Sequence, residues 1–393
     1  MGDVKNLHIG QITSFYIPPV TLVGSGSCKQ IPDRLACRDA KYPLIVTDKG
    51  IVACGILKTI TDILDAANVK YAVYDGAVPN PTDTNVEEAF AMYKEKGCDS
   101  LMTLGGGSAH DCGKGVGFLV ANGGRIHDYE GVNKSSKPFP PYVAVNTTAG
   151  TASEMTRFCI ITDTSRKVKM AIVDWRCTPG VAIDDPDLMM GMPPALTAAT
   201  GMDALTHAIE GYTTLAAWEL ADTLNIKAVE LIAKSLRKAV ENDPDGREGM
   251  ALGQYMTGMA FSNVGLGVVH GMAHPLSAFY NTPHGVANAV LLPYVMEYNA
   301  EYTGEKYREI ARAMGVKGVD SMTQEEYRKA AIDAVKQLSI DVNIPQTLAE
   351  IGVKEEDLEA LTDAAMADVC TGGNPRPCTW EEVLGVYKTA FGK

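Results

Sequence analysis

Four of the seven histidines fall between residues 207 and 284. Asp203 and His207 stand four residues apart in GMDALTHAIE, so on a helix both side chains would project from one face, about 6 Å apart. His270 and His274 repeat this spacing in VVHGMAHPL, and His284 follows a proline-containing turn. Three neutral imidazoles and one carboxylate suit a divalent first-row metal such as Fe²⁺ or Zn²⁺ and leave a coordination position open. Each histidine taken singly could equally be an ordinary core or surface residue.

A glycine-rich segment offers a second kind of chemistry. Gly105, Gly106, Gly107 and Ser108 follow the apolar run SLMTL and precede a predicted helix. In this arrangement, backbone N–H groups at a helix N-terminus can bind a pyrophosphate. The glycines could instead form a tight turn, and Ser108 with Asp111 fits a capping box. Both interpretations stay open on this segment alone.

Two more segments place polar side chains directly after predicted strands. Asp48 ends PLIVTD, where a carboxylate can accept hydrogen bonds from a ribose diol and would repel a 2′-phosphate, which favours NAD over NADP. Thr147, Thr148 and Thr156 belong to the hydroxyl-rich turn NTTAGTASEMT. Such a turn binds polar atoms of a ligand or satisfies its own backbone.

The elements that must hold these residues differ between the two halves of the chain. In the first half, β-rich runs alternate with helical patterns, which predicts βαβ units and a mainly parallel sheet. A β-hairpin is expected within 159–174. From Pro193 onward the apolar residues recur at helical spacing. The β-rich runs are 43–48, 69–76, 99–108, 141–150 and 181–186, and the clearest helices of this half are 83–96 and one ending near Asn122.

We therefore expect two domains with a boundary near Asp187. Residues 1–187 would form an α/β NAD-binding domain and residues 188–393 an all-helical metal-binding domain. A dinucleotide held by the sheet and a metal held by the helices would meet in a cleft between the two domains.

Composition excludes several other classes of function. The formal net charge of −13 disfavours nucleic acid and anionic membrane surfaces as partners. There is no signal-peptide pattern, and no apolar run approaches the roughly 20 residues that cross a bilayer. The nine cysteines include no C-x-x-C pair, so a reducing, cytoplasmic location with free thiols is expected. Cys370 and Cys378, which flank a turn-rich stretch, are interpreted as free thiols rather than as a zinc site or a disulfide.

The motifs resemble those of the iron-containing (group III) alcohol dehydrogenases. The resemblance spans nearly the whole chain, and its segments are GGGSAHDCGKG, VNTTAGTASEMT, VAIDDPDLMMGMPPALTAATGMDALTHAIEGY, HGMAHPL and PHGVANAV. Within the family, DCGKG, NTTAGTASE and RKVKMAIVDWR are most similar to the branch of 1,3-propanediol dehydrogenase and the NAD-dependent methanol dehydrogenases. This sequence departs from many members at Asn146, where they have proline, and at Ala152, where they have glycine.

The resemblance implies the fold shared by these enzymes and dehydroquinate synthase, and it assigns residues to roles. The implied metal ligands are Asp203, His207, His270 and His284, and His274 would lie beside the nicotinamide and the substrate. Members often form dimers or larger assemblies of dimers such as decamers, so a homo-oligomer is expected. The implied NAD contacts are Asp48, Asn80, Gly105, Gly106, Gly107, Ser108, Asp111, Thr147, Thr148, Thr156, Lys169 and Leu188.

The expected reaction is reversible hydride transfer between a primary alcohol and NAD⁺. The alcohol would belong to the class of ethanol, methanol, butanol or 1,3-propanediol, with the metal acting as a Lewis acid and the proton leaving through the cofactor ribose and His274. Fe²⁺ is the first candidate for the metal and Zn²⁺ the second.

Three alternatives to this reaction have different requirements. A cyclase like 3-dehydroquinate synthase would need basic residues beside the metal motifs, whereas the Lys and Arg residues between Asp203 and His284 all fall in one predicted helix and its exit. A glycerol dehydrogenase-like enzyme would use fewer histidine ligands. A catalytically silent assembly subunit would not need an open coordination position or His274.

Overall fold

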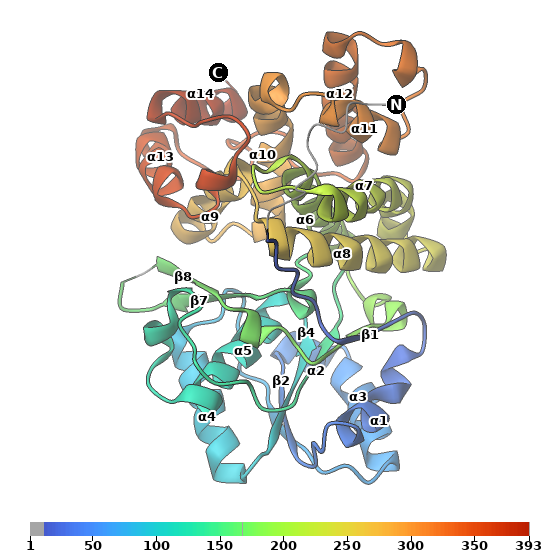
Figure 1. Ribbon diagram of the computed structural model, residues 1–393, viewed down its shortest axis with the longest axis vertical. Coiled ribbons are helices and arrows are strands. Elements are labelled where there is room, and N and C mark those ends of the chain that lie inside the picture. Colours follow the sequence, from blue (N-terminus) through green and yellow to red (C-terminus); the bar gives the residue numbers. More distant parts are fainter. Residues whose placement is uncertain (1–11, 167, 393) are drawn as a thin grey trace. The chain divides into compact units, whose positions relative to one another are not determined.

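The computed structural model describes residues 12–166 and 168–392. They divide into two compact units, one made of residues 16–191 and one made of residues 12–15 and 192–392 (Figure 1). The first unit ends at Gly191, slightly beyond the boundary expected near Asp187.

A six-stranded sheet forms the centre of the first unit, and every paired neighbour in it is parallel. This confirms the α/β class expected for this half, with βαβ units in which helices connect the strands. In spatial order the strands are β1 (Val20–Val23), β9 (Val181–Asp184), β6 (Tyr142–Asn146), β4 (Ser100–Gly105), β2 (Pro43–Val46) and β3 (Ala72–Tyr74).

Alternate residues of the central strands pack against helices on opposite faces of the sheet. Leu44 and Leu101 share a buried cluster with residues of α4 and α5, whereas Ile45 and Met102 share another with residues of α1 and α3. These strands are therefore buried on both faces, which explains their continuous apolar runs. The helices of this unit are α1 (Ile31–Ala36), α2 (Lys49–Ala53), α3 (Ile56–Ala66), α4 (Asp83–Lys96) and α5 (Gly107–Asn122).

A small second sheet contains the predicted hairpin. β7 (Phe158–Asp163) and β8 (Val168–Val173) pair antiparallel, and the short β5 (Gly131–Val132) pairs parallel with β8. Thr162 and Lys169 are cross-strand partners in this hairpin. Strand β1 was not predicted, because it is an edge strand whose residues are partly exposed and lack a continuous apolar run.

The described residues of the second unit form helices and connecting loops and no strand, as expected. Helix α6 is almost entirely buried from Thr197 to its end, and it packs against α7, α8 and α10. No described helix combines the length and the apolar character needed to cross a membrane. The helices are α6 (Pro194–Thr213), α7 (Glu219–Val240), α8 (Pro244–Val264), α9 (Val268–Tyr280), α10 (His284–Asn299), α11 (Lys306–Ala313), α12 (Gln324–Asp341), α13 (Leu358–Ala367) and α14 (Trp380–Phe391).

Candidate functional site

Three helices of the second unit bring the predicted metal ligands together. Asp203 and His207 lie on one face of α6, His270 lies in the first turn of α9, and His284 is the first residue of α10. One position in the chain makes this approach feasible. A Cβ on Gly285 would lie 2.4 Å from the backbone oxygen of Ala199 in α6, so only glycine lets the start of α10 come this close.

The four side chains direct one donor atom each toward a common region. These atoms all lie within 4.8 Å of one another. Asp203 Oδ1 is 3.9 Å from His270 Nε2 and 3.8 Å from His284 Nε2, and Asp203 Oδ2 is 4.0 Å from His207 Nδ1. Two donors bonded to one first-row cation at about 2.1 Å would lie about 3.0–4.2 Å apart. The separations therefore fit shared coordination and are too long for direct hydrogen bonds.

Protonation also favours a cation at this position. Burial lowers the pKa of His207 to about 4 and that of His270 to about 3, so both imidazoles are neutral at pH 7. His207 Nδ1 is buried and has no hydrogen-bond partner among the described residues. The His207 ring is held by stacking on Phe261, with centroids 4.3 Å apart. Neutral imidazoles and a buried carboxylate are a donor set that fits a divalent metal.

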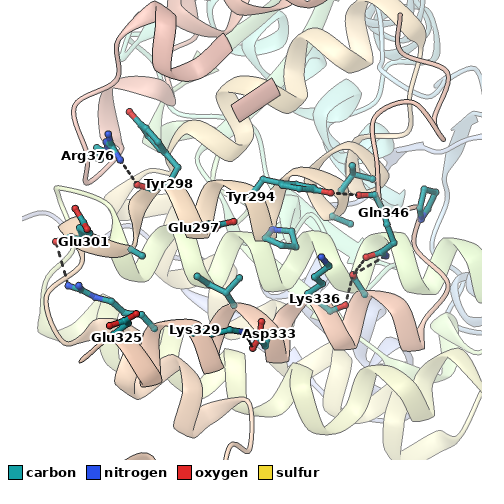
Figure 2. A pocket seen from close by; sticks show the side chains of 18 residues that line it. Tyr294, Glu297, Tyr298, Glu301, Glu325, Lys329, Asp333, Lys336, Gln346 and Arg376 are labelled. Atoms are coloured by element: carbon teal, nitrogen blue, oxygen red, sulfur yellow. Dashed lines mark hydrogen bonds and ion pairs between the residues drawn. The ribbon is translucent and has the colours of Figure 1, made fainter. Parts of the chain in front are cut away.

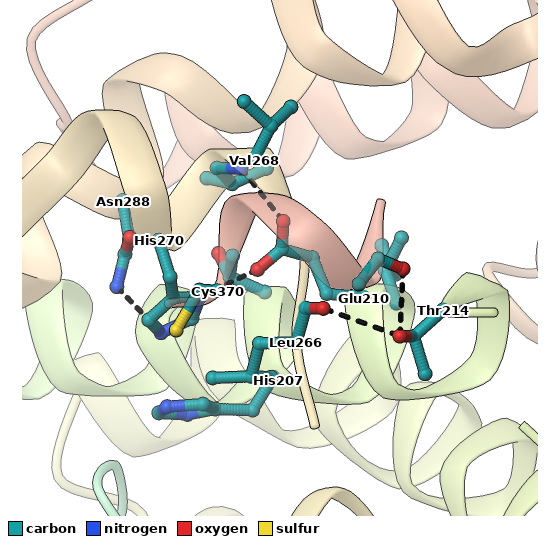
Figure 3. Close-up of polar contacts among 12 residues, drawn as sticks. His207, Glu210, Thr214, Leu266, Val268, His270, Asn288 and Cys370 are labelled. Carbon is teal, nitrogen blue, oxygen red and sulfur yellow. Dashed lines mark hydrogen bonds and ion pairs between the residues drawn. The ribbon is translucent and has the colours of Figure 1, made fainter. Parts of the chain in front are cut away.

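Asn288, one turn after His284 in α10, places its amide nitrogen among these donors. Asn288 Nδ2 is 2.7 Å from Asp203 Oδ1, 3.0 Å from His270 Nε2 and 3.1 Å from His284 Nε2. Because this one amide nitrogen contacts all three acceptor atoms, the acceptors of Asp203, His270 and His284 face the same point. Figure 3 shows Asn288 reaching toward His270.

A second buried carboxylate, that of Glu210, lies on the Nδ1 side of His270. Glu210 Oε2 lies 2.5 Å from His270 Nδ1, and Glu210 Oε1 accepts the Val269 N–H at 2.7 Å (Figure 3). Burial raises the pKa of Glu210 to about 7, against the opposing effect of the backbone N–H groups that donate to it.

His274 lies next to the four donors without belonging to their group. Its ring stacks on that of His284, with centroids 5.3 Å apart and an interplanar angle of 11°. Its Nδ1 is 2.8 Å from Asp368 Oδ2. Burial acts to raise the pKa of Asp368, but the contacts with His274 and Cys370 together outweigh it and the pKa is lowered. Asp368 therefore binds Nδ1 of the His274 ring and leaves Nε2 available.

In the first unit, the carboxyl ends of three adjacent strands gather the other predicted residues. Asp48 follows β2, Gly105 ends β4 and Gly106 follows it, and Thr148 follows β6. A Cβ on Gly105 would lie 3.5 Å from Asp48 Oδ2, and one on Gly106 would lie 2.9 Å from Thr148 Cγ2. Parallel sheets bind ligands at this edge. The turn continues directly into α5, which begins at Gly107 and includes Ser108 in its first turn.

The structure changes the interpretation of three polar residues at this edge. The capping-box alternative for Ser108 and Asp111 is wrong, because the residue before α5 is Gly106 and no side chain caps the helix. Asp111 instead accepts hydrogen bonds from Ser153 Oγ at 2.8 Å and Ile160 N at 3.2 Å. Asp48 Oδ1 accepts the Ile51 N–H at 3.0 Å and so caps α2.

A fully buried lysine fixes the hydroxyl-rich turn. Lys114 Nζ lies within 3.2 Å of five oxygens, which belong to Ser153, Thr156 and Phe158. Thr156 is thus held from α5. Thr147, just after β6, is also buried. The two residues at which this sequence departs from many of the enzymes it resembles have local explanations. Asn146 Nδ2 donates to Asp184 Oδ1 at 2.8 Å, and Ala152 adopts a left-handed φ of 51° that glycine favours.

The remaining predicted cofactor residues fall into two places. Thr162 Oγ1 donates to the Asn80 carbonyl at 3.4 Å, and Lys169 pairs with Thr162 across the hairpin, so Asn80 and Lys169 lie near one another. Leu188 is 5% exposed and belongs to the apolar cluster on the α1 and α3 face of the sheet.

A separate pocket lies between α10 and α12 (Figure 2). Its volume is about 750 Å³, and its lining includes Tyr294, Glu297, Arg328 and Lys336. None of the predicted metal, cofactor or proton-transfer residues lines this pocket. It is therefore not the site that the sequence motifs describe.

A glycine-rich turn at the end of a parallel sheet and a cluster of imidazoles and a carboxylate together meet the requirements of a nucleotide-dependent, metal-assisted oxidoreductase. Residues 18–186 match the iron-containing alcohol dehydrogenases, and residues 197–391 match the C-terminal part of the Fe-containing alcohol dehydrogenase family. The chain therefore belongs to the iron-containing alcohol dehydrogenase family and is an oxidoreductase.

Individual relatives agree with this assignment. Lactaldehyde reductase of Escherichia coli (strain K12) is 54% identical over 370 residues, which cover 94% of this chain and 97% of that protein. NAD-dependent methanol dehydrogenase of Bacillus methanolicus is 43% identical, with coverage of 97% and 100%. The crystal structure of a 1,3-propanediol oxidoreductase superimposes with a TM-score of 0.95 at 43% identity and covers 97% of this chain and 100% of that one. The predicted family, branch and fold are confirmed, and the cyclase alternative is excluded.

Four residues beside the predicted ones were missed by sequence reasoning. Two had a usable signal, since Glu210 continues the helical face of Asp203 and His207, and Asn288 is one turn after His284. Lys114 and Asp368 had none, because their partners are distant in sequence: Lys114 contacts residues 153–158, and Asp368 contacts His274.

Proposed function

We propose that this protein is an NAD-dependent dehydrogenase that interconverts a short primary alcohol and its aldehyde, with a divalent metal held by Asp203, His207, His270 and His284. The observation that carries the proposal is the convergence of these four donor atoms within 4.8 Å in a buried site. When bound there, a divalent cation supplies Lewis acidity that lowers the pKa of an alcohol hydroxyl. Fe²⁺ remains the first candidate and Zn²⁺ the second, since this donor set accepts either ion.

In the first unit, we assign NAD binding to the turn after β4. The N–H groups at the start of α5 would bind the pyrophosphate, and Asp48 would accept hydrogen bonds from the ribose diol. Thr147, Thr148 and Thr156 would offer hydroxyls, held in place by Asn146 and Lys114. Bound NAD⁺ supplies the hydride acceptor. The relative named NAD-dependent methanol dehydrogenase supports this choice of cofactor.

His274 is assigned to proton transfer. Asp368 accepts from its Nδ1, so Nε2 remains available to exchange a proton with the substrate hydroxyl or the cofactor ribose. The ring has 20% of its side-chain surface exposed, which gives the proton a route to solvent.

The substrate class is broader than the sequence alone indicated. The names of relatives include lactaldehyde reductase and methanol dehydrogenase, and a structural relative acts on 1,3-propanediol. We therefore add lactaldehyde and its alcohol, 1,2-propanediol, to ethanol, methanol, butanol and 1,3-propanediol. All have a primary alcohol or aldehyde on a short chain.

The test combines metal analysis with an NADH assay. Purified protein loaded with Fe²⁺ or Zn²⁺ should reduce NAD⁺ with at least one of these alcohols, whereas His207→Ala should retain neither metal nor turnover. Thr214→Val, whose hydroxyl bonds the carbonyls of Leu266 and Gly373 and no candidate metal ligand, is the control and should retain both. A His207→Ala protein that keeps full activity without metal would overturn the proposal. A wild type that binds metal and NAD but oxidises no alcohol of the panel would favour a silent assembly subunit.

A further inference from the structure

Glu210 is buried beside the candidate ligands, and its position follows from the same helix face. It comes three residues after His207 and seven after Asp203, so all three side chains project from one side of α6. Only 4% of Glu210 is exposed. Its two oxygens have different partners, His270 Nδ1 at 2.5 Å and the Val269 N–H at 2.7 Å (Figure 3).

We propose that Glu210 is a positioning residue that fixes His270 in the tautomer able to bind a metal. Where Glu210 is ionised its carboxylate can only accept hydrogen bonds, and His270 then carries its proton on Nδ1. The lone pair is then on Nε2, which is the atom that faces Asp203 at 3.9 Å. The inference rests on the proposed metal site and adds a residue outside the four ligands. Such outer partners typically change metal affinity 10–100-fold when removed, an order-of-magnitude range.

The same carboxylate also fixes the direction in which His270 enters the site. Val269 is in the first turn of α9, where unpaired N–H groups and the helix dipole attract negative charge. A Cβ on Gly267 would lie 2.9 Å from Glu210 Oε1, so the glycine leaves room for the carboxylate. Glu210 therefore sets both the start of α9 and the proton position on its first histidine.

The charge balance of the proposed metal site also supports this role of Glu210. The three imidazoles of the proposed site are neutral ligands, and Asp203 contributes one negative charge. With Glu210 ionised, two buried carboxylates balance a divalent cation, so the occupied site would have no net charge. Buried charges are tolerated in proteins when they are compensated in this way.

The substitution Glu210→Gln separates tautomer selection from helix capping. The glutamine keeps the size of the side chain and one oxygen. If this oxygen accepts the Val269 N–H, the amide NH₂ faces His270 Nδ1 and drives the proton to Nε2. If the amide turns over, its NH₂ opposes the Val269 N–H. The Val269 N–H favours the first orientation, in which the metal-binding tautomer of His270 loses its support while the side chain keeps its size. In the second orientation the amide oxygen still accepts from the His270 Nδ1–H, but the Val269 N–H loses its acceptor.

We would measure the dissociation constants of Zn²⁺ and Co²⁺ by competition with a chromophoric chelator. Glu210→Gln should raise them about 10–100-fold and change the visible spectrum of the Co²⁺ protein. In the metal-free chain with ¹⁵N-labelled histidine, His270 should carry its proton on Nδ1 in the wild type and on Nε2 in the variant. Only seven histidines contribute to that spectrum.

Thr214→Val is the matched structural control. Thr214 Oγ1 bonds the carbonyls of Leu266 and Gly373, so it ties the end of α6 to the segment before α9 without touching a ligand. This variant should keep the metal affinity and the His270 tautomer of the wild type.

The outcomes distinguish the inference from the proposed function. Wild-type affinity and an unchanged tautomer in Glu210→Gln would overturn the role of Glu210 and leave the metal site standing. Equal losses of metal affinity in Glu210→Gln and Thr214→Val would show that Glu210 is only a structural cap, and would also overturn its proposed role. A wild type that binds neither Zn²⁺ nor Co²⁺ would overturn the proposed metal site, and the inference with it.

Discussion

His274 and Asp368 form a hydrogen-bonded pair that is next to the metal donors but separate from them. His274→Ala should therefore keep the metal and lose turnover, by about 10²–10⁴-fold if the ring acts in proton transfer. Metal content by elemental analysis and kcat for the best alcohol measure the two effects separately.

The control for this prediction is Asp368→Asn, which keeps the shape of the pair and weakens its hold on the ring. We expect it to retain metal and to lose less activity than His274→Ala. Loss of metal in His274→Ala would make His274 a ligand instead. An unchanged pH–rate profile would remove it from the proton path.

Asp48 has a structural and a proposed functional role, and one substitution separates them. Serine is also a good N-cap, so Asp48→Ser should preserve α2 while removing the charge proposed to bind ribose. Loss of a charge-assisted hydrogen bond predicts a rise of about tenfold or more in the KM for NAD⁺, together with a smaller preference over NADP⁺.

Asp48→Ala is the comparison, because it removes the cap as well and should cost about 1 kcal/mol of stability. If Asp48→Ser keeps both the KM and the cofactor preference of the wild type, then Asp48 is only a helix cap.

At the scale of elements, the metal donors depend on how closely α10 approaches α6. Gly285→Ala would place a methyl group 2.4 Å from the Ala199 carbonyl oxygen. The helix must then move, so we expect a loss of about 1–3 kcal/mol in unfolding free energy and weaker metal binding through displacement of His284. Chemical denaturation and metal titration would measure the two effects.

Gly385 in α14 provides the matched control, since a Cβ there meets nothing within 4 Å. Gly385→Ala should be neutral or stabilise by roughly 0.5–1 kcal/mol and leave metal affinity unchanged. Metal affinity that survives Gly285→Ala would show that the approach of the two helices does not limit the site.

At the scale of the whole molecule, the metal and NAD are proposed to bind to different compact units. Chelation should therefore lower hydrogen-exchange protection in α6, α9 and α10, whereas NAD should raise it in the turn from β4 to α5 and in residues 147–158. Metal at 100 times its dissociation constant should stabilise the protein by about 2.7 kcal/mol. Chelation that changes protection in the first unit alone would contradict the assignment of the metal to the helical unit.

The homo-oligomer implied by the family resemblance stays a prediction. Light scattering should give a mass that is an even multiple of the chain, either a dimer or a larger assembly such as a decamer. A monomer at all accessible concentrations would contradict it.

The sequence by itself determined the family, the α/β and helical halves, and the four residues proposed as metal ligands. It could do so because the strand and helix patterns and the family motifs are all local; the family resemblance, and not the spacing, selected the four ligands. Helical spacing puts Asp203 and His207 on one face, and a glycine run between a strand and a helix predicts a phosphate-binding turn. Buried parallel strands likewise give apolar runs that can be recognised without knowing their neighbours.

The tertiary structure decided which side chains support those residues. Glu210 faces His270 and Asp368 faces His274 only because folding brings the side chains of α9 to one in α6 and to one in the segment after α13. Lys114 is bound by residues of a distant turn, and Asp111 is tied to β7 rather than capping α5. Partners of this kind have no fixed spacing in the chain, because folding brings them together across long stretches of sequence. The edge strand β1 was missed for a related reason, since its pairing with β9 leaves only a weak apolar pattern.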